Sequence, residues 1–253
     1  MSDGRRAGLA GAADDATVAA MPTIALEGPG KNALSTELLT RMLEAILAAK
    51  DEPLFLIGAG DTFSAGLNLK EVATHDVAGM TRYLGTLEKV VKALYEHPAP
   101  VVAFVNGHAI AGGCVMALTA DVRIATAREG VRIGLNEVAL GLRFPPLTLA
   151  MCRARVSRPA IERAILEAAL YDAKSALSLG LVDRIGEESD ARAAFEMLSK
   201  HPRAIFASTK RFLRGTLDVS AEEQRIFREE TIPYWASEEQ QAKVRAYLER
   251  KKA

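Results

Sequence analysis

The chain has 253 residues and a mass of 27.2 kDa, and its 32 lysine and arginine residues balance its 32 aspartate and glutamate residues. This balance gives no electrostatic reason to expect nucleic acid or an anionic membrane as a partner. The length, with no linker-like stretch in the middle of the sequence, predicts one α/β domain with a helical appendage.

The N-terminal residues and the cysteines indicate the compartment. Residues 1–17 contain acidic residues and no sustained apolar core, so we expect a flexible tail there rather than a signal peptide. No later run approaches the ~18 apolar residues of a membrane-spanning helix. Cys114 and Cys152 lie within apolar runs and lack the spacing of a metal site or disulfide framework. The sequence therefore predicts a cytoplasmic protein with no metal site and no membrane contact.

The first half of the chain alternates short apolar strands with amphipathic helices. Strands are predicted over 23–26, 54–57 and 101–105, and helices after the Ser35 cap and over 77–95. Pro98 and Pro100 end the second helix and lead into the third strand. This order indicates parallel βαβ crossovers rather than a sandwich.

A glycine-rich turn lies in the stretch PVVAFVNGHAIAGGCVMALTAD, residues 100–121, between a strand and an apolar helix. Gly112 and Gly113 would open that helix, predicted over 112–119, whose first amides have no intrahelical partners. Such amides can receive a carbonyl oxygen or a developing oxyanion. Alternatively, the glycines only permit a tight turn. A similar unit, with Gly58 and Gly60 before FSAGLNL, supplies the second strand-turn-helix that a paired-amide oxyanion hole needs.

The second half is mostly helical. Further strands are predicted over 121–126, 131–133 and 181–185, and helices over 147–154, 160–169, 172–179, 189–200, 203–213, 221–230 and 238–251. Glu137 is the only ionisable residue between Gly134 and Gly141. Apolar neighbours would raise its pKa toward the range of a general base or acid. The alternative is an exposed loop glutamate.

Four motifs in order resemble the crotonase (enoyl-CoA hydratase/isomerase) superfamily: FSAGLNL, NGHAIAGGC, IGLNEVALGL and AKSALSLGLVDRI. The resemblance covers roughly residue 22 to the C-terminus, and the motifs are most similar to the mitochondrial type of 3,2-trans-enoyl-CoA isomerase. It implies a spiral of ββα units over residues 18–188. It also implies a helical trimerisation region over 189–253, which packs against neighbouring subunits and covers the acyl-CoA site. The implied assembly is a homotrimer or a hexamer made of two trimers.

The resemblance also implies which residues bind an acyl-CoA thioester. Its carbonyl oxygen would lie between the amides of Leu67 and Gly112, and Lys31 would lie near the CoA phosphates, although a solvated loop lysine is the equal alternative. The implied substrate-binding residues are Lys31, Ser64, Ala65, Gly66, Leu67, Asn68, Gly112 and Asn136. No cofactor is implied, because CoA is part of the substrate.

The choice of reaction depends on carboxylates. Hydratases of this superfamily use two glutamates, and the first of these positions is Val115 here. The remaining Glu137 suits a proton shuttle that moves the double bond of a 3-enoyl-CoA to the trans-2 position, as in fatty acid β-oxidation. The alternatives are hydration, acyl-CoA hydrolysis, decarboxylation, or a non-catalytic acyl-CoA binder.

The sequence leaves open a possible hydrolase triad and the role of Arg143. Ser64, His108 and Asp121 suggest a hydrolase triad, which the missing G-x-S-x-G elbow disfavours. Arg143 stands where isomerases of this kind usually carry an apolar residue. It either pairs with a nearby acidic residue or gives the acyl pocket a polar end.

Overall fold

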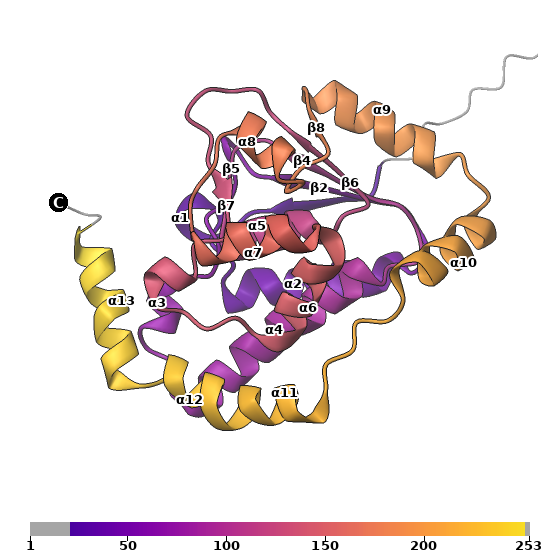
Figure 1. Cartoon of the computed structure of the whole chain (residues 1–253). Helices are drawn as coiled ribbons and strands as arrows, with labels where there is room; N and C mark the ends of the chain where they lie inside the picture. The colour runs from indigo at the N-terminus through magenta and orange to yellow at the C-terminus, as the bar shows by residue number, and fades with distance from the viewer. Residues whose placement is uncertain (1–20, 251–253) are drawn as a thin grey trace, which may run out of the picture.

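The computed structural model describes residues 21–250, which form two parallel sheets surrounded by helices (Figure 1). The larger sheet has the order β1-β2-β4-β6-β8, formed by Thr23–Leu26, Leu54–Gly58, Val101–Val105, Val122–Ala125 and Arg184–Ile185. The smaller sheet has the order β3-β5-β7, formed by Thr62–Ser64, His108–Ile110 and Ile133–Gly134. All strand pairs are parallel, which confirms the predicted α/β class. The predicted tail over 1–17 lies outside the described residues.

The helices begin where the sequence places capping side chains. Ser35 accepts a hydrogen bond from the Leu38 amide (3.1 Å), and Asp76 accepts one from the Gly79 amide (2.7 Å). The helices up to the last strand are α1 (Pro29–Asn32), α2 (Thr36–Ala49), α3 (Leu69–Val72), α4 (Val77–Tyr95), α5 (Gly112–Thr119), the 3₁₀ turn η1 (Val138–Leu140), α6 (Pro146–Arg155), α7 (Arg158–Leu166) and α8 (Ala173–Ser178). After it follow α9 (Glu188–Ser199), α10 (Arg203–Arg214), α11 (Ala221–Ile226), the π turn η2 (Phe227–Thr231), α12 (Ile232–Trp235) and α13 (Glu238–Arg250). No helix within residues 21–250 has both the length and the apolarity to cross a bilayer.

The larger sheet is covered on both faces, so its central strands are apolar throughout. On one face Phe55, Val102 and Phe104 pack against α9. The rings of Phe55 and Phe195 meet edge to face there, with their centres 6.1 Å apart. Figure 1 shows α9 on that side and α2, α4 and α6 on the other. Helix α9 therefore completes the packing of the sheet on the first of these faces.

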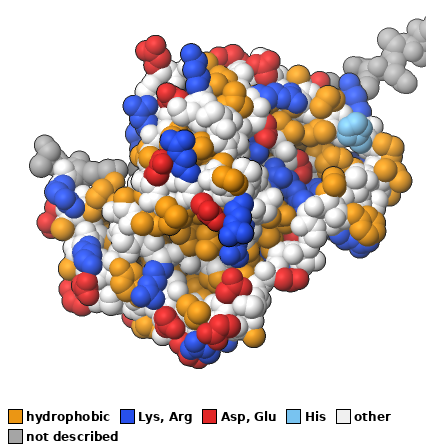
Figure 2. All heavy atoms as spheres, viewed as in Figure 1, with side chains coloured by type: hydrophobic (Ala, Val, Ile, Leu, Met, Phe, Trp, Pro, Cys, Tyr) orange, Lys and Arg blue, Asp and Glu red, His pale blue; other side chains and the backbone are white. Residues whose placement is uncertain are grey.

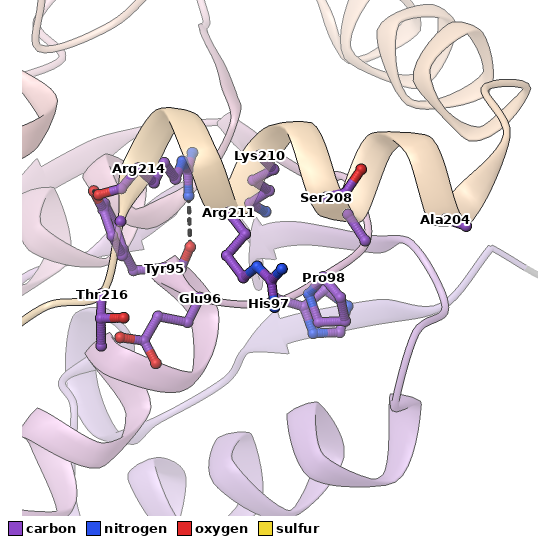
Figure 3. Close-up of a pocket in the computed structure, with 12 residues that line it drawn as sticks. Tyr95, Glu96, His97, Pro98, Ala204, Ser208, Lys210, Arg211, Arg214 and Thr216 are labelled. Atoms are coloured by element: carbon purple, nitrogen blue, oxygen red, sulfur yellow. Dashed lines mark hydrogen bonds between the residues drawn. The ribbon is translucent and has the colours of Figure 1, made fainter.

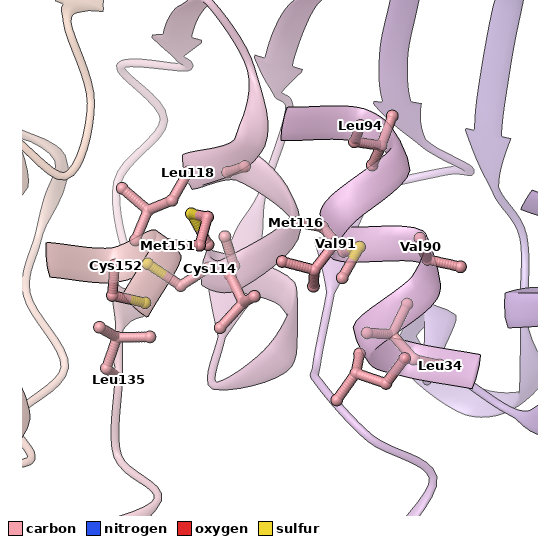
Figure 4. Close-up of a cluster of buried hydrophobic side chains, with 14 of the residues drawn as sticks. Leu34, Val90, Val91, Leu94, Cys114, Met116, Leu118, Leu135, Met151 and Cys152 are labelled. Atoms are coloured by element: carbon pink, nitrogen blue, oxygen red, sulfur yellow. The ribbon is translucent and has the colours of Figure 1, made fainter. Parts of the chain in front are cut away.

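Helix α5 lies at the centre of the main core. All its residues are buried, so it has apolar contacts on every side. Cys114, Met116 and Leu118 contribute to the cluster that Figure 4 shows, together with Met151 and Cys152 of α6. Burial raises the pKa of the Cys114 thiol to about 12, so this thiol is a core group rather than a nucleophile.

The sequence did not reveal the smaller sheet or the break in the C-terminal helix. Strands β3 and β5 are three residues each, too short for a period-two pattern, and β7 begins at Ile133 rather than at 131. The helix predicted over 221–230 ends at Ile226 and widens into a π turn, where the Ile232 amide donates to the Phe227 carbonyl. Pro233 explains the break, because a proline has no amide hydrogen and clashes with the carbonyl four residues back.

Helix α10 is anchored at the C-terminal end of α4 by buried charges. The Asp121 carboxylate binds Lys210 Nζ at 2.8 Å and the Arg214 guanidinium at 2.7 Å. Arg214 also donates to the Tyr95 carbonyl at 2.7 Å, and the Tyr95 hydroxyl donates to the Arg214 carbonyl at 3.1 Å. A cavity of about 470 Å³ lies here (Figure 3). Because Lys210 and Arg214 are satisfied by protein partners, we interpret this contact as structural.

Candidate active site

A second cavity, of about 390 Å³, lies between the N-terminus of α5, the loop after β7 and the C-terminal helices. Seven of the residues predicted from the sequence line it: Lys31, Ala65, Leu67, Asn68, Gly112, Asn136 and Glu137. The other two are not among the lining residues. Ser64 is fully buried, where its hydroxyl donates to the Asn32 carbonyl at 2.7 Å and accepts from the Gly66 amide at 3.2 Å. Ser64 therefore shapes the loop rather than facing the cavity.

Two backbone amides meet at the edge of this cavity. Gly66 has a φ of +87°, and a Cβ placed on it would lie 2.8 Å from the Ile110 carbonyl oxygen and 3.2 Å from the Gly112 nitrogen. Glycine is therefore required where these two turns approach each other. Among the described residues, neither the Leu67 amide nor the Gly112 amide donates to a protein acceptor. The pair has the free donors that an oxyanion hole needs.

Polar contacts fix the loop that carries Leu67. The Asn68 amide donates to the Tyr83 hydroxyl at 2.9 Å, and the Asn68 side chain caps α3 by accepting from the Lys70 amide at 3.2 Å. Lys31 lies on the exposed side of the cavity and pairs with Asp61 at 3.2 Å, where it lowers the pKa of that carboxyl. Lys31 can thus meet an anionic group outside the apolar part of the cavity.

Glu137 has a fixed backbone, and one oxygen of its carboxyl group is buried without a partner. Its carbonyl accepts from the amides of Leu140 (3.0 Å) and Leu142 (2.9 Å), and Gly141, with a φ of +68°, completes the turn. The side chain is 8% exposed, and its Oε2 atom is buried without a hydrogen-bond partner in the described part of the chain. Burial raises the pKa of Glu137 to about 8, which is the environment expected of a general base.

The remaining lining residues provide little further acid–base chemistry. Glu137 is the only carboxylate among the described residues around the cavity, and Val115, which is 1% exposed, adds apolar surface. Asn136 Oδ1 and Thr148 Oγ1 are also buried without partners within residues 21–250. The cavity is therefore apolar, with a few unpaired polar atoms that can orient a ligand.

The structure does not assemble the triad considered from the sequence. Ser64 is bonded to backbone groups, His108 Nδ1 accepts from the Arg132 amide at 3.1 Å, and Asp121 binds the cations of α10. These three side chains therefore have separate structural roles.

Arg143 lines the cavity, but its charged group is directed to α12. The guanidinium lies 4.5 Å from the centre of the Tyr234 ring and 3.9 Å from Glu230. Of the two expectations for this residue, the pairing with a nearby acidic residue is the one observed.

The structure shows which residues of the C-terminal helices form one wall of the cavity. Trp235 of α12 and Tyr247 and Leu248 of α13 line the cavity, beside Leu142 and Phe144 of the loop after Glu137. The amphipathic pattern of the C-terminal segment indicated a covered apolar face, and the family resemblance implied that this region covers the acyl-CoA site. Neither signal identified the individual lining residues.

Comparisons with known proteins agree with this geometry. The family model for enoyl-CoA hydratase/isomerase matches residues 16–253. The human mitochondrial enoyl-CoA delta isomerase 1 is 30% identical over 180 residues, which are 69% of this chain and 60% of the human protein. A putative enoyl-CoA hydratase from Thermus thermophilus is 31% identical over 194 residues, 72% of this chain and 76% of that protein. The crystal structure of human mitochondrial delta3-delta2-enoyl-CoA isomerase matches with a TM-score of 0.79 at 27% identity, over 89% of this chain and 91% of that one.

The chain belongs to the enoyl-CoA hydratase/isomerase family, and its fold is that of the crotonase superfamily. The predicted likeness to the mitochondrial isomerases is confirmed by sequence and by structure. Relatives named as hydratases match at similar identity, so the family fixes an acyl-CoA enzyme of the crotonase type and leaves the reaction to be argued from the site.

Proposed function

We propose that this protein is an enoyl-CoA isomerase that converts a 3-enoyl-CoA into the trans-2-enoyl-CoA. One observation supports this proposal above the others: Glu137 is the single carboxylate among the described residues around the cavity. The other glutamate of a hydratase is missing because Val115 stands at its position. Moving a proton between two carbons of one substrate needs one base, whereas hydratases of this superfamily hold water between two.

In the proposed mechanism the thioester oxygen accepts hydrogen bonds from the amides of Leu67 and Gly112. The negative charge that develops on this oxygen makes the C2 proton acidic, and each donor is worth about 3 kcal/mol in the transition state. Glu137 removes the C2 proton and returns a proton to C4 of the resulting dienolate. Electrons stay within the carbon framework, so we propose that no cofactor takes part beyond the CoA of the substrate.

We also propose where the CoA phosphates and the acyl chain bind and how the chains assemble. Lys31, exposed beside the cavity, would meet a CoA phosphate, and the acyl chain would lie along Trp235 and Phe144. We propose a trimer, or a hexamer of two trimers, in the cytoplasm. Exposed apolar side chains such as Leu166 (72% exposed) and Phe212 (81% exposed) are consistent with further contacts between chains. Figure 2 shows that hydrophobic side chains are interspersed with charged ones over one face of the molecule.

The test is to incubate purified protein separately with a 3-enoyl-CoA and with a trans-2-enoyl-CoA and to identify the products. We expect the first to become the trans-2 isomer and the second to remain almost unhydrated. Efficient formation of the 3-hydroxyacyl-CoA would instead establish a hydratase, the reaction named for several relatives. Binding of both thioesters with no turnover would indicate a non-catalytic acyl-CoA binder. Glu137→Gln protein is the matched control for adventitious activity.

A further inference from the structure

Helix α12 contacts the loop that follows Glu137 through two backbone carbonyls. The Tyr234 hydroxyl donates to the Gly141 carbonyl at 2.8 Å and lies 2.9 Å from Oε1 of the buried Gln240. The indole Nε1 of Trp235 donates to the Arg143 carbonyl at 2.9 Å. Consecutive residues of one short helix thus hold the loop at two points.

These carbonyls have few other partners. The turn after Glu137 is closed by two amides, those of Leu140 and Leu142, which donate to the Glu137 carbonyl. The carbonyls of Gly141 and Arg143 lie outside any helix or strand, so they are not used by regular secondary structure. At the far end of the loop, Glu88 of α4 accepts from the Leu147 amide at 3.0 Å. The loop is therefore supported by α4 at its end and by α12 at its middle.

Helix α12 is itself rigidly placed. Ile232 is 2% exposed and Trp235 is 1% exposed, and both belong to the main core. A π turn joins α12 to α11, and π turns often occur at functional positions. The Arg143 guanidinium over the Tyr234 ring adds a third contact between helix and loop.

We infer that Tyr234 and Trp235 are positioning residues for Glu137, which hold the loop so that the carboxylate stays at the reacting carbons. The inference rests on the proposed isomerase function, but it concerns a residue, Tyr234, that does not line the cavity. A misplacement of a catalytic group by about 1 Å can cost on the order of a hundredfold in rate. A looser loop also admits water to the carboxylate, which lowers the pKa of Glu137 toward its ordinary value.

Tyr234→Phe tests this with the smallest change, because only the hydroxyl is removed. Trp235→Phe removes the indole donor and is a second variant. Because Trp235 also lines the cavity, this variant tests the inference through hydrogen exchange, which should be faster over the loop than in Tyr95→Phe protein. Tyr95→Phe is the matched control: it also removes a tyrosine hydroxyl that donates to a backbone carbonyl, but at the α10 anchor. All three variants are compared with wild type for melting temperature, for kcat and KM on a 3-enoyl-CoA, for pH profile, and for amide hydrogen exchange over residues 137–145.

We expect Tyr234→Phe to lower kcat by about tenfold with KM changed less than about twofold, since only the alignment of the base is affected. The rising limb of its kcat/KM profile should move to lower pH, and the amides of Leu140 and Leu142 should exchange faster. Tyr95→Phe protein should lose about as much thermal stability as Tyr234→Phe protein, while its kcat, its pH profile and the amide exchange of the loop stay as in wild type. Wild-type kcat, pH profile and exchange in Tyr234→Phe protein would overturn the inference.

Hydrogen exchange separates this result from a failure of the proposed function. If wild-type protein does not isomerise a 3-enoyl-CoA, the function is wrong, and the exchange rates over residues 137–145 still decide the role of Tyr234. Faster exchange in Tyr234→Phe than in Tyr95→Phe protein would support positioning of the loop, and equal exchange would overturn it.

Discussion

The Leu67 nitrogen lies 3.5 Å from the point where a Cβ on Gly112 would stand, so two turns that are distant in sequence bring their free amides side by side. Neither amide needs a particular side chain to act as a donor. A test must therefore change the backbone itself.

Gly112→Pro removes the proposed donor and should abolish isomerase activity. Gly112 is the first residue of α5, where the amide has no intrahelical partner, so proline there removes no hydrogen bond of the helix. Gly112→Ala is the control, because it keeps the amide and places a methyl group 3.2 Å from the movable end of Leu34. Circular dichroism should show both variants folded. An active, folded Gly112→Pro protein would exclude this amide from the oxyanion hole.

Glu137→Gln should lower kcat by roughly two to four orders of magnitude, because the amide keeps the size of the side chain but cannot accept the proton. Acyl-CoA affinity, measured by calorimetry, should stay close to wild type. A variant with near wild-type turnover would show that another group carries the proton.

The pH profile should report the same carboxyl. The proposed base acts in its ionised form, and burial raises the pKa of Glu137 to about 8. For the free enzyme kcat/KM should therefore rise by about tenfold between about pH 7 and pH 9 and then level off. A profile that is flat across this range would contradict the assignment.

Glu137 should also make stability depend on pH. Its pKa is raised in the folded protein, from the ordinary value of 4.5 to about 8, so the folded state binds the proton more tightly than the unfolded chain. Tighter proton binding by the folded state raises the free energy of unfolding. This stabilising contribution of Glu137 is fully present below about pH 4.5 and is lost progressively as the pH rises to about 8. Glu137→Gln protein should consequently melt at a higher temperature than wild type at pH 8.5 and lose this advantage near pH 5. Equal melting temperatures at pH 8.5 would indicate a solvated carboxylate.

Trp235 should report ligand binding directly. It is the only tryptophan of the chain, and it lines the cavity while its indole donates to a backbone carbonyl. An acyl-CoA in the cavity should change the intensity or wavelength of its fluorescence, whereas free CoA should change it less. An unchanged spectrum at saturating acyl-CoA would mean that the acyl chain binds elsewhere.

Local chemistry explains what could be predicted from the sequence. The strands over 101–105 and 54–57, the Ser35 cap and the glycine turns depend on neighbouring residues, and they are found where expected. Glu137 could be proposed as the base because it is alone among apolar neighbours and because the family resemblance favoured this role over an exposed loop glutamate. The smaller sheet was missed, because its strands are held by partners distant in sequence rather than by a pattern of their own. The contacts of Tyr234 and Trp235 were also missed, since only the folded chain brings α12 to the loop after Glu137.

The order of the site residues along the chain has a consequence for synthesis. The amides of Leu67 and Gly112 and the carboxylate of Glu137 emerge from the ribosome first, whereas Trp235, Tyr247 and Leu248 emerge near the end. A nascent chain, or one clipped after α10, lacks these three lining residues and therefore lacks the wall that they form beside the proposed donors and base. The wall proposed for the acyl chain is completed only when the last helices are in place.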